Sequence, residues 1–489
     1  MLFSSIEFIF RFLPVFMLIY LLVPEKYRNI VLLSGSLVFY GVGEPYYVLL
    51  LIFSIIVNYA AGLLILSNNR KSRKSLKKAK NPKNDKSVSL KTAEEYKWYS
   101  KYVLSLALLF DFGILFVYKY WDFIAENINK LSTADIMPVL SIGLPLGISF
   151  YTFQMASFLF DCYRGKIKGS TSIVEFSTYV SMFPQLVMGP IIKYEEVEGE
   201  LKWRKSTYKN IEDGLKLFSI GLGFKVLLAN QIGTLWTTLM TAGAGSLSLP
   251  AAWMGAFAYS FEIYFDFWGY SLMAKGLGEM LGFNLPDNFD NPYASKSLSA
   301  FWRRWHITLG RWFKEYLYIP LGGNRKGFVR TIFNLLIVWT LTGIWHGANY
   351  NFALWGLTFF LLLSIEKCGI GKWLEQRKVL GHIYVIILIP ITWMIFAISD
   401  MNKLVLYLQN MAGIHTEGVI VGSEQVMRYL KEYGLLFIVC IIFSIPGTMS
   451  FCRKHKDKWY GILAIVAVFW FSVYEIMKGN NNPFLYFGF

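Results

Sequence analysis

Two histidines have sequence surroundings in which a proton-transferring group could act. His306 ends the run Phe-Trp-Arg-Arg-Trp-His, and His346 ends the run Leu-Thr-Gly-Ile-Trp-His. Both lie in or beside apolar sequence, where an ionisable side chain is costly and usually functional, and imidazole titrates near neutral pH. We expect His346 to be a general base in a cavity; the alternative is a histidine hydrogen-bonded between packed helices. His306 is either a second functional histidine or a side chain that contacts lipid headgroups.

Two carboxylates suggest a different chemistry. Asp266 lies in the middle of an apolar segment, and Glu262 precedes it by about one helical turn, so the two side chains would share a helix face. Such a pair could form a proton path in a transporter, orient a hydroxyl or cationic partner, or serve a structural role by pairing with a base. The sequence leaves these roles of Asp266 open.

The composition is that of a multi-pass membrane protein. Of the 489 residues, 55% are hydrophobic and only 16% are charged, against about a quarter charged in soluble proteins. Apolar runs of roughly twenty residues recur, and each is long enough to span hydrocarbon as a helix. The expected fold class is therefore an all-α transmembrane helical bundle.

The net charge of +16 is concentrated in one stretch. Twelve of the 48 Lys and Arg residues fall between Arg70 and Lys101. Cytoplasmic loops collect such residues, and clusters of them also meet anionic lipid headgroups. We interpret 68–101 as a basic cytoplasmic loop and expect membrane lipid, not nucleic acid, as a partner.

We expect twelve membrane spans and two irregular segments. If the basic stretch is inside, alternation of the spans places the other loops rich in Lys and Arg inside as well, and the loops left outside are poor in them. This pattern puts both termini outside. Pro and Gly in 172–192 predict a broken or re-entrant segment. Segment 297–320 mixes Trp and Phe with Arg and Lys, which predicts a helix lying in the inner membrane interface. The expected spans cover residues 3–23, 30–44, 47–67, 102–120, 138–160, 213–240, 251–280, 331–346, 349–366, 380–398, 433–450 and 459–477.

Several well-known catalytic motifs are absent from the sequence. Residues 322–327 lack the spacing of a Walker A loop, there is no G-x-S-x-G elbow, and no two histidines have metal-ligand spacing. We therefore expect neither an ATP-driven pump, nor a serine hydrolase, nor a metal site. The four cysteines fit neither a zinc site nor a disulfide framework.

The block at 257–356 resembles the membrane-bound O-acyltransferase (MBOAT) family, in the branch of the alginate O-acetyltransferases. With its flanking pieces the resemblance touches nearly the whole chain. One departure is Trp268, where a Ser would be expected, and a larger side chain there could narrow the cavity. The matching pieces are Phe3-Ser4-Ser5, Phe183-Pro184-Gln185, Gly189-Pro190, Tyr264-Phe265-Asp266-Phe267, Gly269-Tyr270-Ser271, Gly276-Leu277-Gly278, Asn288-Phe289, Pro292-Tyr293, the two histidine runs, Trp312-Phe313, residues 316–325 and the ending 484–489.

The resemblance implies one integral-membrane domain over 1–489, with a central tunnel and a catalytic core block at 257–356. His346 would take the role of the family's invariant histidine, and His306 that of a second histidine on the cytoplasmic side. The implied donor is a cytoplasmic thioester, acetyl-CoA, which is a substrate rather than a permanently bound cofactor. The acceptor side would face outward.

Other side chains would then help to bind the substrates. Arg303 and Arg304 could hold the phosphates of CoA, or could contact headgroups alone. Trp345 Nε1 or Asn349 could stabilise the negative charge that develops on the thioester oxygen. Asp266 is a further candidate for substrate binding.

We therefore expect a bacterial inner-membrane O-acyltransferase that moves acetyl groups across the bilayer to an extracytoplasmic polysaccharide. The chain has no soluble segment large enough to hold a glycan, so an extracytoplasmic partner protein is expected. The alternatives are D-alanyl transfer to teichoic acid from a carrier-protein thioester, peptidoglycan O-acetylation, a proton-coupled transporter and a structural scaffold.

Overall fold

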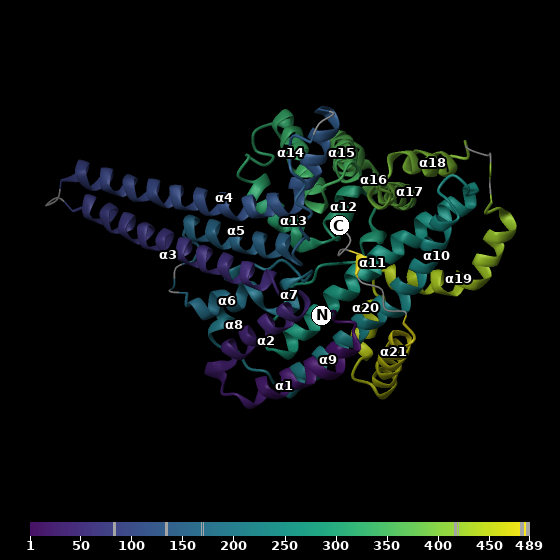
Figure 1. The fold of residues 1–489 in the computed structure, drawn as a ribbon, viewed down its shortest axis with the longest axis horizontal. Coiled ribbons are helices and arrows are strands. Elements are labelled where there is room, and N and C mark those ends of the chain that lie inside the picture. Colours follow the sequence, from purple (N-terminus) through teal and green to yellow (C-terminus); the bar gives the residue numbers. More distant parts are fainter. Residues whose placement is uncertain are drawn as a thin grey trace. The chain divides into compact units, whose positions relative to one another are not determined.

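A computed structural model shows the described part of the chain to be almost entirely helical, as expected (Figure 1). The described residues are 1–489 except 82–84, 133–134, 168, 170, 415–417, 419, 480–483 and 486–489.

Close contacts divide the chain into two compact units. The first unit consists of residue 1, residues 10–208 and residues 281–285. The second unit consists of residues 2–9, 209–280 and 286–489, and it contains every candidate site residue from the sequence.

The first unit is built on a hairpin of two long helices, α3 (Tyr47–Ala79) and α4 (Lys86–Ser132), which lie side by side (Figure 1). Ser72 Oγ donates to Ala93 O across the hairpin at 2.8 Å. The stretch expected to be a basic loop is thus helical up to Ala79 and again from Lys86. Lys, Arg and Glu are good helix formers, so a run of charges can continue an apolar helix.

The rest of the first unit consists of shorter helices. The segment at 172–192 is broken, as expected, because two short helices are separated at Met182 and no helix covers 187–193. The span expected at 138–160 begins only at Ile148. The helices are α1 (Leu13–Leu22), α2 (Arg28–Gly43), α5 (Ile148–Arg164), α6 (Ile173–Ser181), α7 (Phe183–Leu186) and α8 (Tyr194–Lys202).

The second unit is arranged around the long helix α11 (Leu249–Met280), which is buried along most of its length. A Cβ on Gly221 would lie 2.5 Å from the carbonyl oxygen of Gly269, so α9 and α11 pack backbone to backbone there. The other elements are α9 (Tyr208–Gly223), η3 (Phe224–Ala229), α10 (Asn230–Thr241), α12 (Leu298–Trp302), α13 (Ile307–Phe313), η5 (Lys314–Tyr318), α14 (Phe328–His346), α15 (Tyr350–Ile365), η6 (Glu366–Ile370), α16 (Gly371–Gln376), α17 (Lys378–Ala397), α18 (Met401–Met411), α19 (Ser423–Ser444), α20 (Thr448–His455) and α21 (Trp459–Met477).

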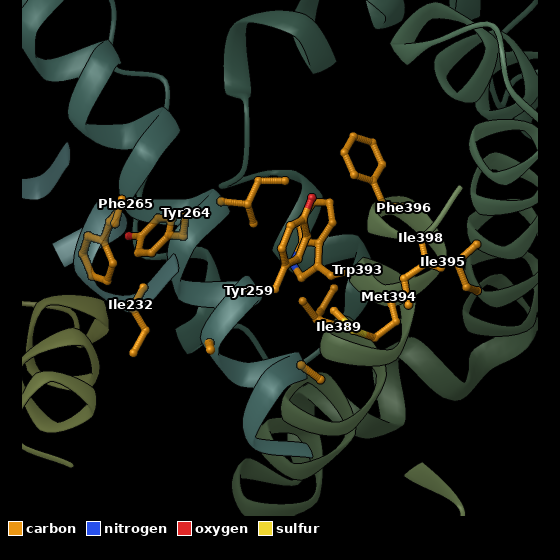
Figure 2. Close-up of a cluster of buried hydrophobic side chains, with 14 of the residues drawn as sticks. Ile232, Tyr259, Tyr264, Phe265, Ile389, Trp393, Met394, Ile395, Phe396 and Ile398 are labelled. Carbon is orange, nitrogen blue, oxygen red and sulfur yellow. The ribbon is translucent and has the colours of Figure 1, made fainter. Parts of the chain in front are cut away.

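The core of the second unit is rich in aromatic side chains. Figure 2 shows Tyr264 and Phe265 of α11 together with Trp393 and Phe396 of α17 in this cluster. Trp268, where the sequence departs from the family pattern, stacks on Tyr264 at 5.0 Å within the same cluster. These rings fix the position of α11 against α17, and both helices border the candidate site.

The chain is a multi-pass membrane protein. Among the described residues, seven helices are long and apolar enough to cross a membrane, or eight if α19 and α20 form one broken span. This number is smaller than the twelve spans expected. The helix in the first expected span is short, α11 lies outside this set, and the span expected at 433–450 bends by 82° between α19 and α20, around Pro446. Proline lacks the backbone N–H and its ring crowds the preceding turn, so it kinks or breaks a helix.

Segment 297–320 is not the single interfacial helix that was expected. It consists of α12, a turn at 303–306, α13 and the π-helix η5. Phe301, Trp305 and Trp312 are buried in the protein rather than exposed for contact with headgroups. Apolar periodicity continues through the turn, so the sequence pattern does not reveal it.

Candidate active site

The segment formed by α12 and the turn that carries His306 is held at its two ends by hydrogen bonds. Both carboxylate oxygens of Glu366 accept backbone N–H groups at the start of α12, from Leu298 at 2.6 Å and Ser299 at 2.9 Å. An acid at this position satisfies N–H groups that a helix leaves without partners. After the turn, the backbone N–H of Ile307 donates to the carbonyl oxygen of Asn288 at 3.0 Å.

His306 itself has a strained backbone, with φ 44° and ψ 54°. A residue with a Cβ in this left-handed region carries roughly 1–3 kcal/mol of strain, and such strain tends to occur at functional sites. Its side chain is only 2% exposed. His306 is therefore not a headgroup-contacting surface residue.

Among the described residues, the imidazole of His306 has one hydrogen-bonding partner, and aromatic rings pack against it. Its Nδ1 lies 3.2 Å from Asn288 Oδ1, and its ring meets that of Phe267 edge-on at 4.7 Å. His306 lies outside the helices that could cross the membrane, and burial lowers its pKa to about 3. The ring is therefore neutral at physiological pH.

His346 is the last residue of α14 and is 6% exposed. Its ring lies about 5 Å from those of Trp345, Trp355 and Phe396, at 5.0, 5.1 and 5.1 Å between centroids. These aromatic rings come from α14, α15 and α17, so three helices fix where the imidazole lies.

Two glycines near His346 let helices approach. A Cβ on Gly343 would collide with the carbonyl oxygen of Phe352, and one on Gly347 would collide with the Phe352 ring. The small residues of this run therefore accommodate helix α15.

Trp345 brings the two histidines into one cluster. Its ring lies 6.3 Å from that of His306 and 5.0 Å from that of His346. The two imidazoles are thus separated by no more than the sum of these distances, although they are 40 residues apart in the sequence. Each of these buried imidazoles could act as a general acid or base toward a group bound within hydrogen-bond reach of it.

The residues predicted to bind substrate differ in how far they are buried and in the partners they contact. Arg303 and Arg304 lie in the turn before His306 with partly exposed side chains, and they approach Glu375 at 3.2 Å and Asp290 at 4.0 Å. Asn349 is the residue that precedes α15, and its side chain is partly buried and does not cap that helix.

Asp266 has partners that the sequence did not indicate. It forms a buried ion pair with Lys225 of η3, and its second oxygen accepts the backbone N–H of Leu485 at 3.0 Å. Lys225 is 41 residues away in the sequence, and no periodic pattern links the two. The same holds for Asn288, which the sequence offered only as part of a family motif.

The fold and this cluster define a class, namely a multi-pass helical membrane protein with two buried histidines that contact one tryptophan. Residues 87–408 match the profile of the membrane-bound O-acyltransferase family, and the chain belongs to that family. It is an O-acyltransferase.

Named relatives carry related activities. The chain is 34% identical to the probable alginate O-acetylase AlgI of Azotobacter vinelandii, with all of both chains covered. It is 30% identical to a peptidoglycan O-acetyltransferase of Helicobacter pylori, with 100% of this chain and 98% of that protein covered. It is 26% identical to a teichoic acid D-alanyltransferase of Bacillus subtilis, over 57% of this chain and 71% of that protein.

Proposed function

We propose that the chain transfers acetyl groups from acetyl-CoA in the cytoplasm to a polysaccharide outside the bacterial inner membrane. The observation that carries this proposal is the buried cluster of His306 and His346 around Trp345. The full-length similarity to O-acetylases of alginate and of peptidoglycan supports acetyl as the group and a glycan as the acceptor.

The chemistry asked of the cluster is the removal of one proton. A hydroxyl oxygen attacks the thioester carbonyl carbon, the C–S bond breaks, and the proton of the hydroxyl ends on the thiolate. A neutral imidazole within hydrogen-bond reach can take that proton and return it, which typically contributes a factor of about 10²–10⁴ in rate. His346 is the proposed base, and His306 acts beside it.

The proposal includes a partner protein outside the membrane, with both chain ends also outside. The described residues form helices and short connections, and the glycan would be bound by the partner. Arg303 and Arg304, which are partly exposed, would meet the phosphates of acetyl-CoA on the inner side.

The test is transfer of radiolabel from acetyl-CoA in membranes that contain the chain and its partner. Wild type is compared with His346→Ala, His306→Ala and the matched control His455→Ala, whose imidazole lies on α20, is only partly buried and donates to the carbonyl oxygen of Phe451 in its own helix. Each variant is checked for equal amount in the membrane. We expect label on an extracytoplasmic acceptor in wild type and the control, and a loss of at least about 100-fold in the two site variants.

The same assay separates the alternatives. Label that does not depend on His346 would overturn the proposed base, and full glycan acetylation without any partner would overturn the partner. If only a charged carrier protein served as donor, the D-alanylating reaction would replace the proposed one.

A further inference from the structure

The amide of Asn288 has only one orientation that fits its neighbours. Its Oδ1 accepts from the backbone N–H of Thr308 at 3.2 Å and from the Thr308 hydroxyl at 3.0 Å. A backbone N–H can only donate. The oxygen of the amide must therefore face Thr308, because the alternative orientation would set the amide NH2 group against the backbone N–H, which can only donate.

This orientation decides the tautomer of His306. Nδ1 of the imidazole lies 3.2 Å from the same Oδ1, which can only accept. Nδ1 must therefore carry the proton. Since the neutral ring has one N–H, Nε2 is left as a bare acceptor.

Two polar atoms of this pair are buried and have no hydrogen-bond partner within the described part of the chain. They are Nε2 of His306 and Nδ2 of Asn288. A buried polar atom without a partner costs roughly 1–3 kcal/mol, and the strained φ of His306 adds to this. A histidine that served packing alone would not combine an open acceptor with a strained backbone.

We propose that Asn288 is a positioning residue that holds His306 with Nε2 unprotonated, so that Nε2 accepts a hydrogen bond from an O–H or N–H group of a substrate. The inference rests on the proposed function for the identity of the substrates. Two groups share this chemistry, namely the hydroxyl of the acceptor and the amide N–H of the pantetheine arm of acetyl-CoA.

The first test measures the tautomer directly and does not depend on transfer activity. Full-length protein labelled with ¹⁵N-histidine is studied by solid-state NMR in bilayers, and His306→Ala identifies the His306 signals. We expect a protonated Nδ1 and a bare Nε2 in wild type, and loss of this single form in Asn288→Ala. A protonated Nε2, or an imidazolium at neutral pH, in wild type would overturn the proposal.

The second test uses kinetics of acetyl transfer to separate the two groups. The matched control is Asn410→Ala, because Asn410 is also fully buried and donates to one backbone carbonyl, that of Ala244 at 2.8 Å. If Nε2 binds the acceptor hydroxyl, Asn288→Ala lowers kcat about 10-fold or more and leaves the KM for acetyl-CoA unchanged. If it binds the pantetheine amide, that KM rises about 10-fold.

Equal kinetics in Asn288→Ala and Asn410→Ala would overturn the positioning role. An absence of acetyl transfer in wild type would count against the proposed function, while the NMR result would still decide the tautomer.

Discussion

At the scale of single residues, His306 combines features that are each unfavourable for stability. It is nearly fully buried, it has a left-handed backbone, and its Nε2 has no partner among the described residues. The hydrogen bond from Ile307 to Asn288 and the contact with Phe267 hold it in this state. Strain persists where surrounding structure over-determines it, and here that structure is the 288–308 segment.

The lowered pKa of His306 predicts that its ring stays neutral across the physiological pH range. Because burial lowers that pKa to about 3, the ¹⁵N signals of His306 should not change between pH 8 and pH 5 in a bilayer NMR titration. Free histidine in the same buffer would serve as the reference for a ring that titrates near pH 6.5. Protonation of His306 near pH 6.5 would contradict the prediction.

The same pKa fixes the direction of an effect on stability. Unfolded chain takes up the proton near pH 6.5, but the folded protein does so only near pH 3. The contribution of His306 to the free energy of unfolding is thus fully present above pH 6.5. It is lost as the pH falls from 6.5 toward 3. Charged groups on the flanking segments include Asp287, which pairs with Lys275 at 2.6 Å, Arg303, which lies 3.2 Å from Glu375, and Asp290, which lies 4.0 Å from Arg304.

At the scale of elements, the contact between α14 and α15 positions His346. A Cβ on Gly343 would lie 3.1 Å from the Cα of Gly356 and would also collide with the carbonyl oxygen of Phe352. These are backbone atoms, so one helix would have to move. Gly343 is about one turn before His346, and a shift of α14 would displace the imidazole.

We therefore predict that Gly343→Ala lowers the free energy of unfolding by about 1–3 kcal/mol and reduces acetyl transfer. The control is Gly434→Ala on α19, where an added Cβ meets no atom within 4 Å, and where alanine should stabilise the helix by up to about 1 kcal/mol. Thermal unfolding in detergent measures both. A Gly343→Ala variant as stable and active as the control would mean that this helix contact does not set the site.

The sequence predicts helices well and their interruptions poorly. The span expected at 459–477 coincides with α21, because its apolar run is bounded by Lys458 and Lys478. The sequence did not predict the turn at 303–306. It also did not predict that α3 and α4 continue as helices into the basic stretch. Apolar periodicity continues across the turn, and a basic run looks alike whether it is helical or not.

The same limit applies to the candidate site. His306 and His346 could be identified because histidine is rare in apolar membrane-spanning sequence. Asn288 and Lys225 could not be assigned roles, because each depends on a partner that only the fold brings near. The relation between His306 and His346 likewise depends on Trp345, which contacts both rings.

At the scale of the whole molecule, the two ends of the chain pack on the same helix. Phe3 stacks on Tyr270 of α11 at 4.9 Å, and Phe484 meets Tyr270 edge-on at 4.7 Å. Phe484 is buried and also lies under the Lys225 ammonium at 4.7 Å. Lys225 and Asp266 therefore join α11 to the segment near the C-terminus, whose residues 486–489 lie outside the described part.

This arrangement predicts that Asp266 serves the structure rather than a proton path. Asp266→Asn would leave the Lys225 ammonium without its counter-charge and should lower the free energy of unfolding by about 3–5 kcal/mol. The double variant Asp266→Leu with Lys225→Met removes both charges and should recover most of that stability, because a buried ion pair can often be replaced by apolar side chains of similar volume. Acetyl transfer should follow stability and return in the double variant. A double variant that folds but has lost function, together with a His346→Ala variant that keeps function, would contradict this prediction. The Asp266 carboxylate itself would then be required, as in a proton-coupled transporter.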